Sequence, residues 1–169
     1  MKKLTIVTAA CLFVAAAHAQ TPGEKKGWPS NERHAFVTEC IKEARAGMSE
    51  DSARFYCFCM QEIVEAKYPT VDDAAKITEE DVQSEAWKKD VIACLGGTWN
   101  TEERVAFISN CKTALEKNES AKGISEFYCE CMQYKMEKNY PDPAEAARLA
   151  DDIFSTPKWK KIVADCGAF

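Results

Sequence analysis

Histidine is scarce in this sequence: its 169 residues include only two. One of them, His18, lies in an N-terminal segment that we expect to be removed, which leaves His34 as the single imidazole. Hydrolysis by a serine or cysteine nucleophile uses a histidine as the general base, so the sequence disfavours this chemistry. At the position equivalent to His34 in a later repeat the chain has Val105. We therefore expect His34 to be a surface or half-buried residue without a catalytic role.

The chain also lacks a run of basic residues and any strand-length stretch in which polar and apolar residues alternate. Without a basic patch there is no electrostatic attraction for nucleic acid or for an anionic membrane surface, and we expect neither partner. Without a period of two, nothing indicates a β-strand. Acidic residues are abundant, but no spacing singles out a catalytic pair or a calcium loop.

The first nineteen residues are typical of a signal peptide. Lys2 and Lys3 precede an apolar run over residues 4–17, and small residues at Ala17 and Ala19 form a cleavage site before Gln20. The apolar run is shorter than the roughly 20 residues that a membrane-spanning helix needs. The sequence therefore predicts a periplasmic or secreted protein with no transmembrane segment after cleavage.

Cleavage removes two lysines and no acidic residue, so the remaining 150 residues carry 20 basic and 27 acidic side chains and a formal charge of −7. This length suits one domain. We expect residues 20–27 to form a mobile tail, followed by one helical repeat over residues 28–97 and a second over residues 98–169.

The repeat is visible directly in the sequence. Residues 28–40 align with 99–111 at an offset of 71, and residues 55–97 align with 127–169 at an offset of 72, giving 22 identities in 56 positions. Four cysteines coincide in the two copies, which indicates a duplication. Only the segment 95–98 (LGGT) connects them. This connection is too short for independent tumbling, so we expect the copies to pack as one domain about a pseudo-twofold axis.

Each copy is predicted to form three or four helices, which makes the fold class all-α. The predicted N-caps are Ser30, Ser84, Thr101 and Thr156. A further helix start is predicted at Asp142, with proline next at the first helical position, and a looser equivalent at Thr70. Pro69 and Pro141 end the second helix of each copy, because proline disfavours the helical conformation of the residue before it. We expect the repeated aromatic residues to be core: Trp28, Phe36, Phe55, Tyr56, Tyr68 and Trp87, with Trp99, Phe107, Phe127, Tyr128, Tyr140 and Trp159.

Eight cysteines remain after cleavage: Cys40, Cys57, Cys59, Cys94, Cys111, Cys129, Cys131 and Cys166. An even number in an exported chain favours four structural disulfides. Two cysteines at i and i+2 of a helix project about 200° apart, so the members of each CxC need different partners. Two pairings remain open in the first copy: Cys40–Cys59 with Cys57–Cys94, or Cys40–Cys57 with Cys59–Cys94. The same choice exists in the second copy.

The cysteines also allow two chemical alternatives. The CxC motifs suit a thiol redox protein, although they lie in mid-helix and outside any βαβ pattern. Four thiolates in each copy suit Cu(I) or Zn(II), although the opposed directions of a helical CxC fit one metal ion poorly. We therefore expect no cofactor and no metal site.

The Tyr56-Cys57-Phe58-Cys59-Met60 string and its copy at residues 128–132, each followed by Tyr-Pro, resemble small exported bacterial proteins of no assigned activity. Those proteins carry tandem Trp…Cys…(Phe/Tyr)CxC…TyrPro…Cys units. The resemblance spans nearly the whole chain after residue 27. It implies a shared scaffold and no catalytic residues.

These observations favour a non-enzymatic binding or interaction module. Its ligand, either an unknown protein or a small apolar molecule, is predicted to lie in the groove between the repeats. A groove filled by side chains, on a surface without apolar residues, would count against this hypothesis.

Overall fold

The computed structural model describes residues 27–117, 127–149 and 151–167, which form α-helices and one 3-10 helix and contain no strand. The all-α class is therefore confirmed. The predicted signal peptide, residues 1–19, lies outside the described residues. The predicted tail lies outside them too, except for Gly27.

The first half of the chain contains α1 (Ser30–Ala44), α2 (Glu50–Lys67), α3 (Val71–Ala74), α4 (Glu79–Gln83) and α5 (Glu85–Cys94). The prediction of three or four helices for this half was wrong by one. The additional element is α4, a short helix that Thr78 caps by accepting from the Asp81 N–H at 3.2 Å. Helix α3 is a single turn that Thr70 caps by accepting from the Asp73 N–H at 3.1 Å.

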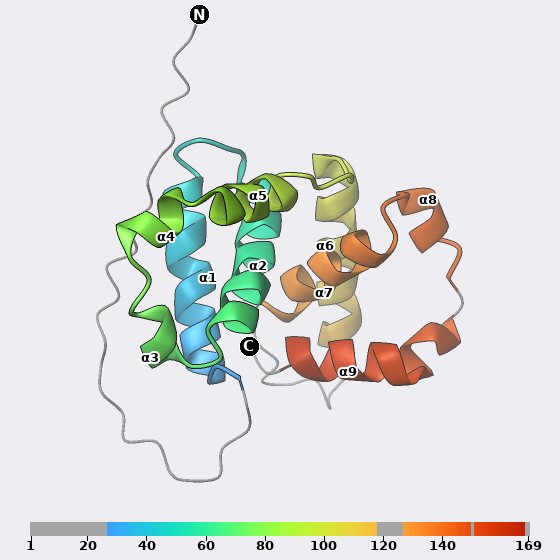
Figure 1. The fold of residues 1–169 in the computed structure, drawn as a ribbon. Helices are drawn as coiled ribbons and strands as arrows, with labels where there is room; N and C mark the ends of the chain where they lie inside the picture. Colours follow the sequence, from blue (N-terminus) through green and yellow to red (C-terminus); the bar gives the residue numbers. More distant parts are fainter. Residues whose placement is uncertain (1–26, 118–126, 150, 168–169) are drawn as a thin grey trace, which may run out of the picture.

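The second half contains α6 (Thr101–Glu116), α7 (Tyr128–Asn139), α8 (Pro143–Ala146), the 3-10 helix η2 (Asp151–Ser155) and α9 (Pro157–Cys166). In Figure 1, α2 and α7 occupy the middle of the molecule. Helix α1 lies beside α2 and α5 crosses one end of it, while α6 and α9 pack against α7. The two CxC helices are thus the central helices of the fold.

Of the predicted N-caps, those at Ser84, Thr156, Asp142 and Thr70 are confirmed, and those at Ser30 and Thr101 are wrong. Ser84 and Thr156 cap α5 and α9 as predicted. Helix α1 follows Pro29 without a side-chain cap. Helix α6 is capped by Asn100, whose side chain accepts from the Glu103 N–H at 3.0 Å while Glu103 accepts from the Asn100 N–H at 2.8 Å. Because this reciprocal capping box satisfies the helix start, the next hydroxyl, on Thr101, is available for another contact.

One hydrophobic core joins the two halves. It includes Val37 from α1, Phe58 from α2, Tyr134 from α7 and Trp159 from α9, all at most 1% exposed. The Phe58 and Tyr134 rings stack with their centroids 6.1 Å apart. Of the aromatic residues predicted to be core, five are buried: Trp28, Phe55, Trp99, Phe127 and Trp159. The other seven are half-buried against the core.

A charged cluster borders this core where α2 meets α7. Glu62 on α2 accepts the Tyr134 hydroxyl at 2.5 Å and forms ion pairs with Lys135 and Lys138. Burial, together with the neighbouring Lys138 ammonium, lowers the pKa of Lys135 to about 8. One carboxylate therefore connects α2 to three side chains of α7.

Candidate functional site

The eight cysteines form four disulfides: Cys40–Cys57, Cys59–Cys94, Cys111–Cys129 and Cys131–Cys166. The second of the two pairings left open is therefore present in both halves. Each CxC divides its cysteines between two partners, as the helical geometry predicted. The first cysteine bonds to the preceding long helix and the second to the last helix of its half. Four such disulfides are typical of a protein in an oxidising compartment.

A network of hydrogen bonds connects the start of the first half to α2. The Trp28 backbone N–H donates to Glu65 at 2.9 Å, and its Nε1 donates to the Tyr68 carbonyl at 2.8 Å. Arg33 donates to both Glu65 oxygens, from Nε at 2.9 Å and from Nη2 at 2.6 Å, and Gln61 donates to the same carboxylate. We call these five residues the first network.

The equivalent residues of the second half make the same bonds. The Trp99 N–H donates to Glu137 at 2.9 Å, and Trp99 Nε1 donates to the Tyr140 carbonyl at 3.0 Å. Arg104 donates to the two Glu137 oxygens from Nε and Nη2, each at 2.9 Å, and Gln133 donates to Glu137 at 2.7 Å. We call these five residues the second network. Five of the positions that are identical in the two copies outside the cysteines thus form the same hydrogen-bond network in each half.

The two networks differ in burial and in one additional partner. The Arg33 and Glu65 side chains are 19% and 16% exposed, whereas Arg104 and Glu137 are 6% and 1% exposed. Arg104 also reaches back into the first half, where its Nη1 lies 3.3 Å from Oδ2 of Asp51. The second network is therefore part of the contact between the halves.

Gly97 allows the connecting segment to pass directly over this buried ion pair. A Cβ atom at position 97 would lie 2.1 Å from Arg104 Nη2 and 2.9 Å from Glu137 Oε1. At Gly96 the nearest atom would lie 3.4 Å away, which is an ordinary contact. Only a residue without a side chain fits at position 97 unless the guanidinium moves.

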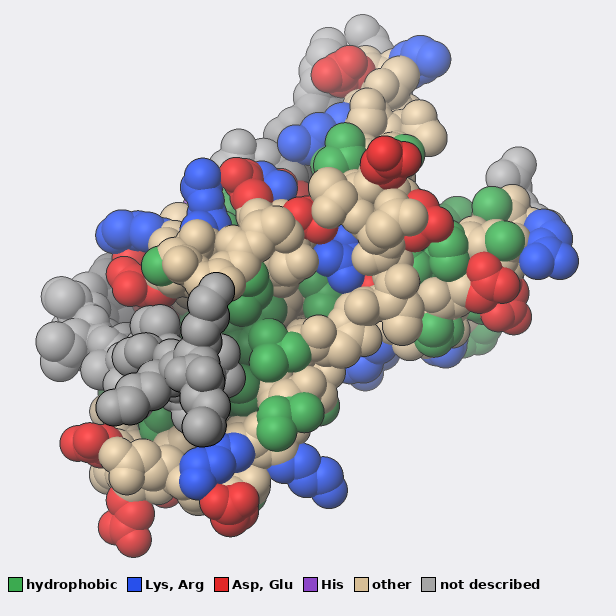
Figure 2. Space-filling model, turned by 90° about the horizontal axis from the view of Figure 1, so that it is seen from above, with side chains coloured by type: hydrophobic (Ala, Val, Ile, Leu, Met, Phe, Trp, Pro, Cys, Tyr) green, Lys and Arg blue, Asp and Glu red, His purple; other side chains and the backbone are tan. Residues whose placement is uncertain are grey.

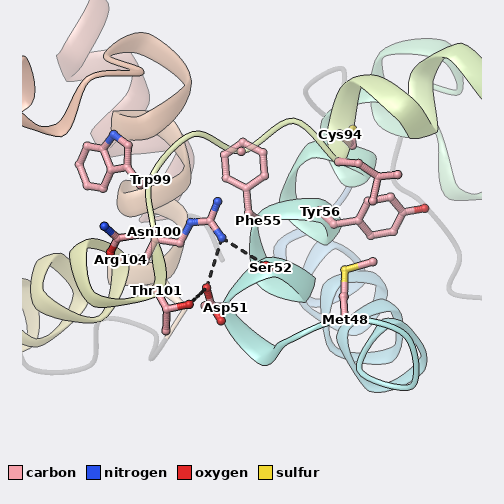
Figure 3. Close-up of a pocket in the computed structure, with 12 residues that line it drawn as sticks. Met48, Asp51, Ser52, Phe55, Tyr56, Cys94, Trp99, Asn100, Thr101 and Arg104 are labelled. Carbon is pink, nitrogen blue, oxygen red and sulfur yellow. Dashed lines mark hydrogen bonds and ion pairs between the residues drawn. The ribbon is translucent and has the colours of Figure 1, made fainter.

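A pocket of about 430 Å³ lies beside the second network, between the two halves (Figure 3). Its apolar wall consists of Met48, Phe55, Tyr56, Leu95 and Trp99, and its polar wall consists of Asp51, Ser52, Asn100, Thr101 and Arg104, with Cys94 and Gly97 between them. We call this space the junction pocket. Its volume lies within the range of small-molecule sites in proteins.

The junction pocket opens on a partly apolar surface. Figure 2 looks onto the side of the molecule along which α5 runs, and hydrophobic side chains reach the surface in the middle of that face. Leu95, at the end of α5, is 57% exposed, and Ile92, one turn earlier, is 68% exposed. Leu95 also lines the pocket, so its exposed aliphatic side chain connects the pocket to the surface.

The polar wall is held in one arrangement by its own contacts. The Thr101 hydroxyl donates to Asp51 Oδ2 at 3.0 Å. Burial raises the pKa of Asp51, but hydrogen bonds from Ser49 and Thr101 and the charge of Arg104 outweigh it, so the pKa lies below its usual value. Burial lowers the pKa of Arg104, and Glu137 and Asp51 reverse this and raise it. Asp51 and Arg104 therefore both keep their charges at neutral pH.

Chemistry at His34 or at a metal ion finds no support in this geometry. His34 is half-buried, as predicted, and its ring packs edge-on against Phe127 with 4.4 Å between centroids. Among the residues that the structure describes, no group of three or more His, Cys, Asp or Glu side chains is placed to hold a metal ion. The disulfide-bonded cysteines present no thiolate in this state.

The sequence predicted a ligand site between the repeats, but it did not predict the charged residues that lie there. Glu65 and Glu137 are identical at an offset of 72, and this identity was a usable signal. Asp51 left no such signal, because its equivalent position falls at Gly123, and its contact with Arg104 joins residues 53 positions apart.

Within the described ranges, no helix is both long and apolar enough to cross a membrane. Comparison of the chain with protein-family models, with curated proteins and with solved structures finds no match.

Proposed function

We propose that this protein is an exported, non-enzymatic binding module and that the junction pocket holds its ligand. The observation that carries the proposal is the pocket itself, a space of about 430 Å³ bounded by both halves of the chain. A volume of this size accommodates a small molecule. The ligand-binding region is thus the groove between the repeats.

The composition of the pocket supports a ligand with an apolar body. Phe55 and Trp99 line the pocket from opposite halves but are at most 8% exposed, so most of the accessible apolar surface belongs to the half-buried Tyr56 and to Leu95, which is 57% exposed. Burying such side chains against a ligand contributes roughly 25 cal/mol for each Å² of apolar surface removed from water. A small apolar molecule is therefore favoured over a flat protein surface as the ligand.

Non-enzymatic binding is supported by the way the reactive groups are used. Arg104, Asp51 and Glu137 bind one another, and the disulfide-bonded Cys94 is the one cysteine in the pocket wall. Catalysis needs a nucleophile or an acid–base group directed at the substrate with a suitable pKa. The ionised, mutually paired groups of this pocket instead suit recognition.

Export to the periplasm or to the cell exterior belongs to the same proposal. The N-terminal pattern over residues 1–19 predicts signal-peptide cleavage, and the four disulfides need an oxidising environment to persist. The N-terminal pattern and the disulfides therefore both support a location outside the cytoplasm.

We further propose that the two halves are copies of one exported tandem-unit scaffold, arranged about a pseudo-twofold axis. A residue that contacts its own counterpart lies beside such an axis. Glu62 and Tyr134 occupy equivalent positions at an offset of 72, and they contact each other at 2.5 Å. The equal disulfide pattern and the two equal networks support the same arrangement.

Binding of the neutral fluorescent probe N-phenyl-1-naphthylamine tests the proposed site. We expect saturable binding with a stoichiometry of one, and a loss of binding in Ser52→Phe, which places a ring inside the pocket. Ser109→Phe, on the exposed surface of α6, is the matched control and retains binding. Circular dichroism shows whether each variant is folded. Absence of saturable binding to the wild-type protein, or equal binding to both folded variants, would remove the proposal.

A further inference from the structure

We infer that the junction pocket selects ligands that carry a positive charge on an apolar body, of the alkylammonium class. This inference rests on the proposed function, since it names the ligand class of the same site. Three observations support it: a net negative charge in the buried cluster beside the pocket, aromatic rings in the pocket lining, and a guanidinium that is already occupied.

The excess charge follows from counting the buried groups. One guanidinium, Arg104, faces two carboxylates, Glu137 and Asp51. Glu137 takes the guanidinium in a bidentate pair with both bonds at 2.9 Å, whereas Asp51 lies 3.3 Å from it. The next charges along α2 balance within their own ion pairs: Glu50 pairs with Arg45 and Arg54, and Arg54 also pairs with Glu130. The buried cluster of Arg104, Asp51 and Glu137 therefore carries one negative charge more than it has positive charges; Asp51 and Arg104 line the pocket, and Glu137 lies behind Arg104.

Little water screens this charge. The Asp51 side chain is only 9% exposed, and in a cleft with apolar walls a charge acts more strongly on a ligand than it does at an open surface. A cation in the pocket offsets the excess charge. An anion adds to it.

The aromatic wall also suits a cation. Aromatic ring faces attract ammonium and guanidinium groups, and quaternary ammonium ligands are often held by several rings. Phe55, Tyr56 and Trp99 line the pocket, and Figure 3 shows Tyr56 and Trp99 on opposite sides of Phe55. The Phe55 ring already has the Arg104 guanidinium carbon 5.1 Å from its centroid. A ring of this wall thus binds a cation within the protein itself.

Recognition of an anion by Arg104 is disfavoured for a geometric reason. Its Nε and Nη2 groups donate to Glu137, and its Nη1 group faces Asp51 and Ser52 at 3.3 and 3.5 Å. A ligand carboxylate or phosphate would have to displace a buried, hydrogen-bonded carboxylate, which is strongly unfavourable. The guanidinium therefore holds the two halves together and leaves recognition to Asp51 and the rings.

Three probes with the same alkyl chain test the inference: octyltrimethylammonium, octanol and octanoate, each titrated as a competitor of N-phenyl-1-naphthylamine. We expect the cation to compete at least about ten times more strongly than octanoate, with octanol between them. Raising the salt concentration should weaken the binding of octyltrimethylammonium and leave the binding of octanol unchanged.

Two sets of variants locate the charge. Asp51→Asn should lower the affinity for octyltrimethylammonium about tenfold and leave the affinity for octanol unchanged. The control Asp72→Asn, which removes an exposed carboxylate from α3, should change neither affinity. Leu95 at the pocket mouth supplies variants that do not disturb the buried ion pair. Leu95→Lys should lower the affinity for octyltrimethylammonium several-fold, and Leu95→Glu should raise it. For octanoate we expect the reverse: a higher affinity in Leu95→Lys and a lower one in Leu95→Glu.

The outcomes separate this inference from the proposed function. If octanol or octanoate competes as strongly as the cation, the pocket binds ligands but does not select for positive charge, and the inference alone is lost. If none of the three probes competes and N-phenyl-1-naphthylamine itself does not bind, both proposals are lost. Cation selectivity that persists unchanged in folded Asp51→Asn and in both Leu95 variants also overturns the inference, because the selectivity then arises elsewhere.

Discussion

The two halves of this molecule carry the same network in different surroundings. In residues 28–97 the Arg33–Glu65 pair lies at the edge of the domain and is partly exposed. In residues 98–167 the Arg104–Glu137 pair is buried under the connecting segment and gains Asp51 from the first half as a third member. The Arg–Glu pair thus joins two helices in both halves, and in the second half its arginine, Arg104, also lines a pocket.

Two halves with the same disulfide framework are thus not equivalent where they meet. The covalent framework is the same in both halves, with disulfide separations of 17 and 35 residues in the first and 18 and 35 in the second. The difference arises where the halves meet, because the start of α2 packs against the start of α6 and places Asp51 beside Arg104. The predictions below test how far this difference extends.

Removal of the central carboxylate should affect the second half far more than the first. Glu137→Gln leaves Arg104 buried with only its weaker partner, so we expect a loss of about 3–5 kcal/mol in the free energy of unfolding. Glu65→Gln, at the partly exposed pair, should cost about 1–2 kcal/mol. Urea unfolding with the disulfides intact measures both. Equal losses in the two variants would show that burial does not distinguish the networks.

The disulfides should respond equally in the two halves. Replacing Cys59 and Cys94 by alanine opens a 35-residue loop, and replacing Cys131 and Cys166 opens a loop of the same length. The chain-entropy model gives a loss of roughly 4 kcal/mol for each. The same unfolding assay measures them. A difference above about 1 kcal/mol would mean that one half depends on its disulfide for more than the loop constraint.

The two adjacent glycines of the connection should differ. Gly97→Ala forces the Arg104 guanidinium away from its position, and we expect a loss of about 1–3 kcal/mol, as for other overpacked sites. Gly96→Ala should change stability by less than about 0.5 kcal/mol, because its Cβ meets only an ordinary contact. Thermal unfolding monitored by circular dichroism compares them. A tolerated Gly97→Ala would mean that the guanidinium has room to move.

Acid should weaken the contact between the halves through Asp51. Its pKa is lowered in the folded state, so it contributes stability above the unfolded pKa of about 3.9 and loses this contribution as the pH falls through the lower folded pKa. At pH 7, Asp51→Asn should cost about 1–2 kcal/mol. The difference from wild type should shrink below pH 4. Unfolding curves between pH 2 and pH 7 measure it, and a constant difference would exclude this linkage.

Much of the fold follows from local features of the sequence. The lack of alternation predicted an all-α protein, and the hydroxyls of Ser84 and Thr156 identified the starts of α5 and α9, because a capping bond spans only three residues. At the start of α6, two neighbouring residues have side chains that can cap a helix; the predicted N-cap was Thr101, but the N-cap is Asn100. Asn100 is the N-cap because Glu103 lies three residues after it and completes a capping box.

The sequence predicted the helical class and the rule that the cysteines of each CxC have different partners, because both depend on the spacing of residues along one helix. The identities between the two halves are visible by direct comparison of the segments. The tertiary structure alone decided that Cys57 faces α1 and Cys59 faces α5, because this depends on the side from which each neighbouring helix approaches α2. It also decided that Asp51 meets Arg104 across the junction. Contacts between residues 53 positions apart leave no periodic pattern, and only the packing of the two halves brings them together.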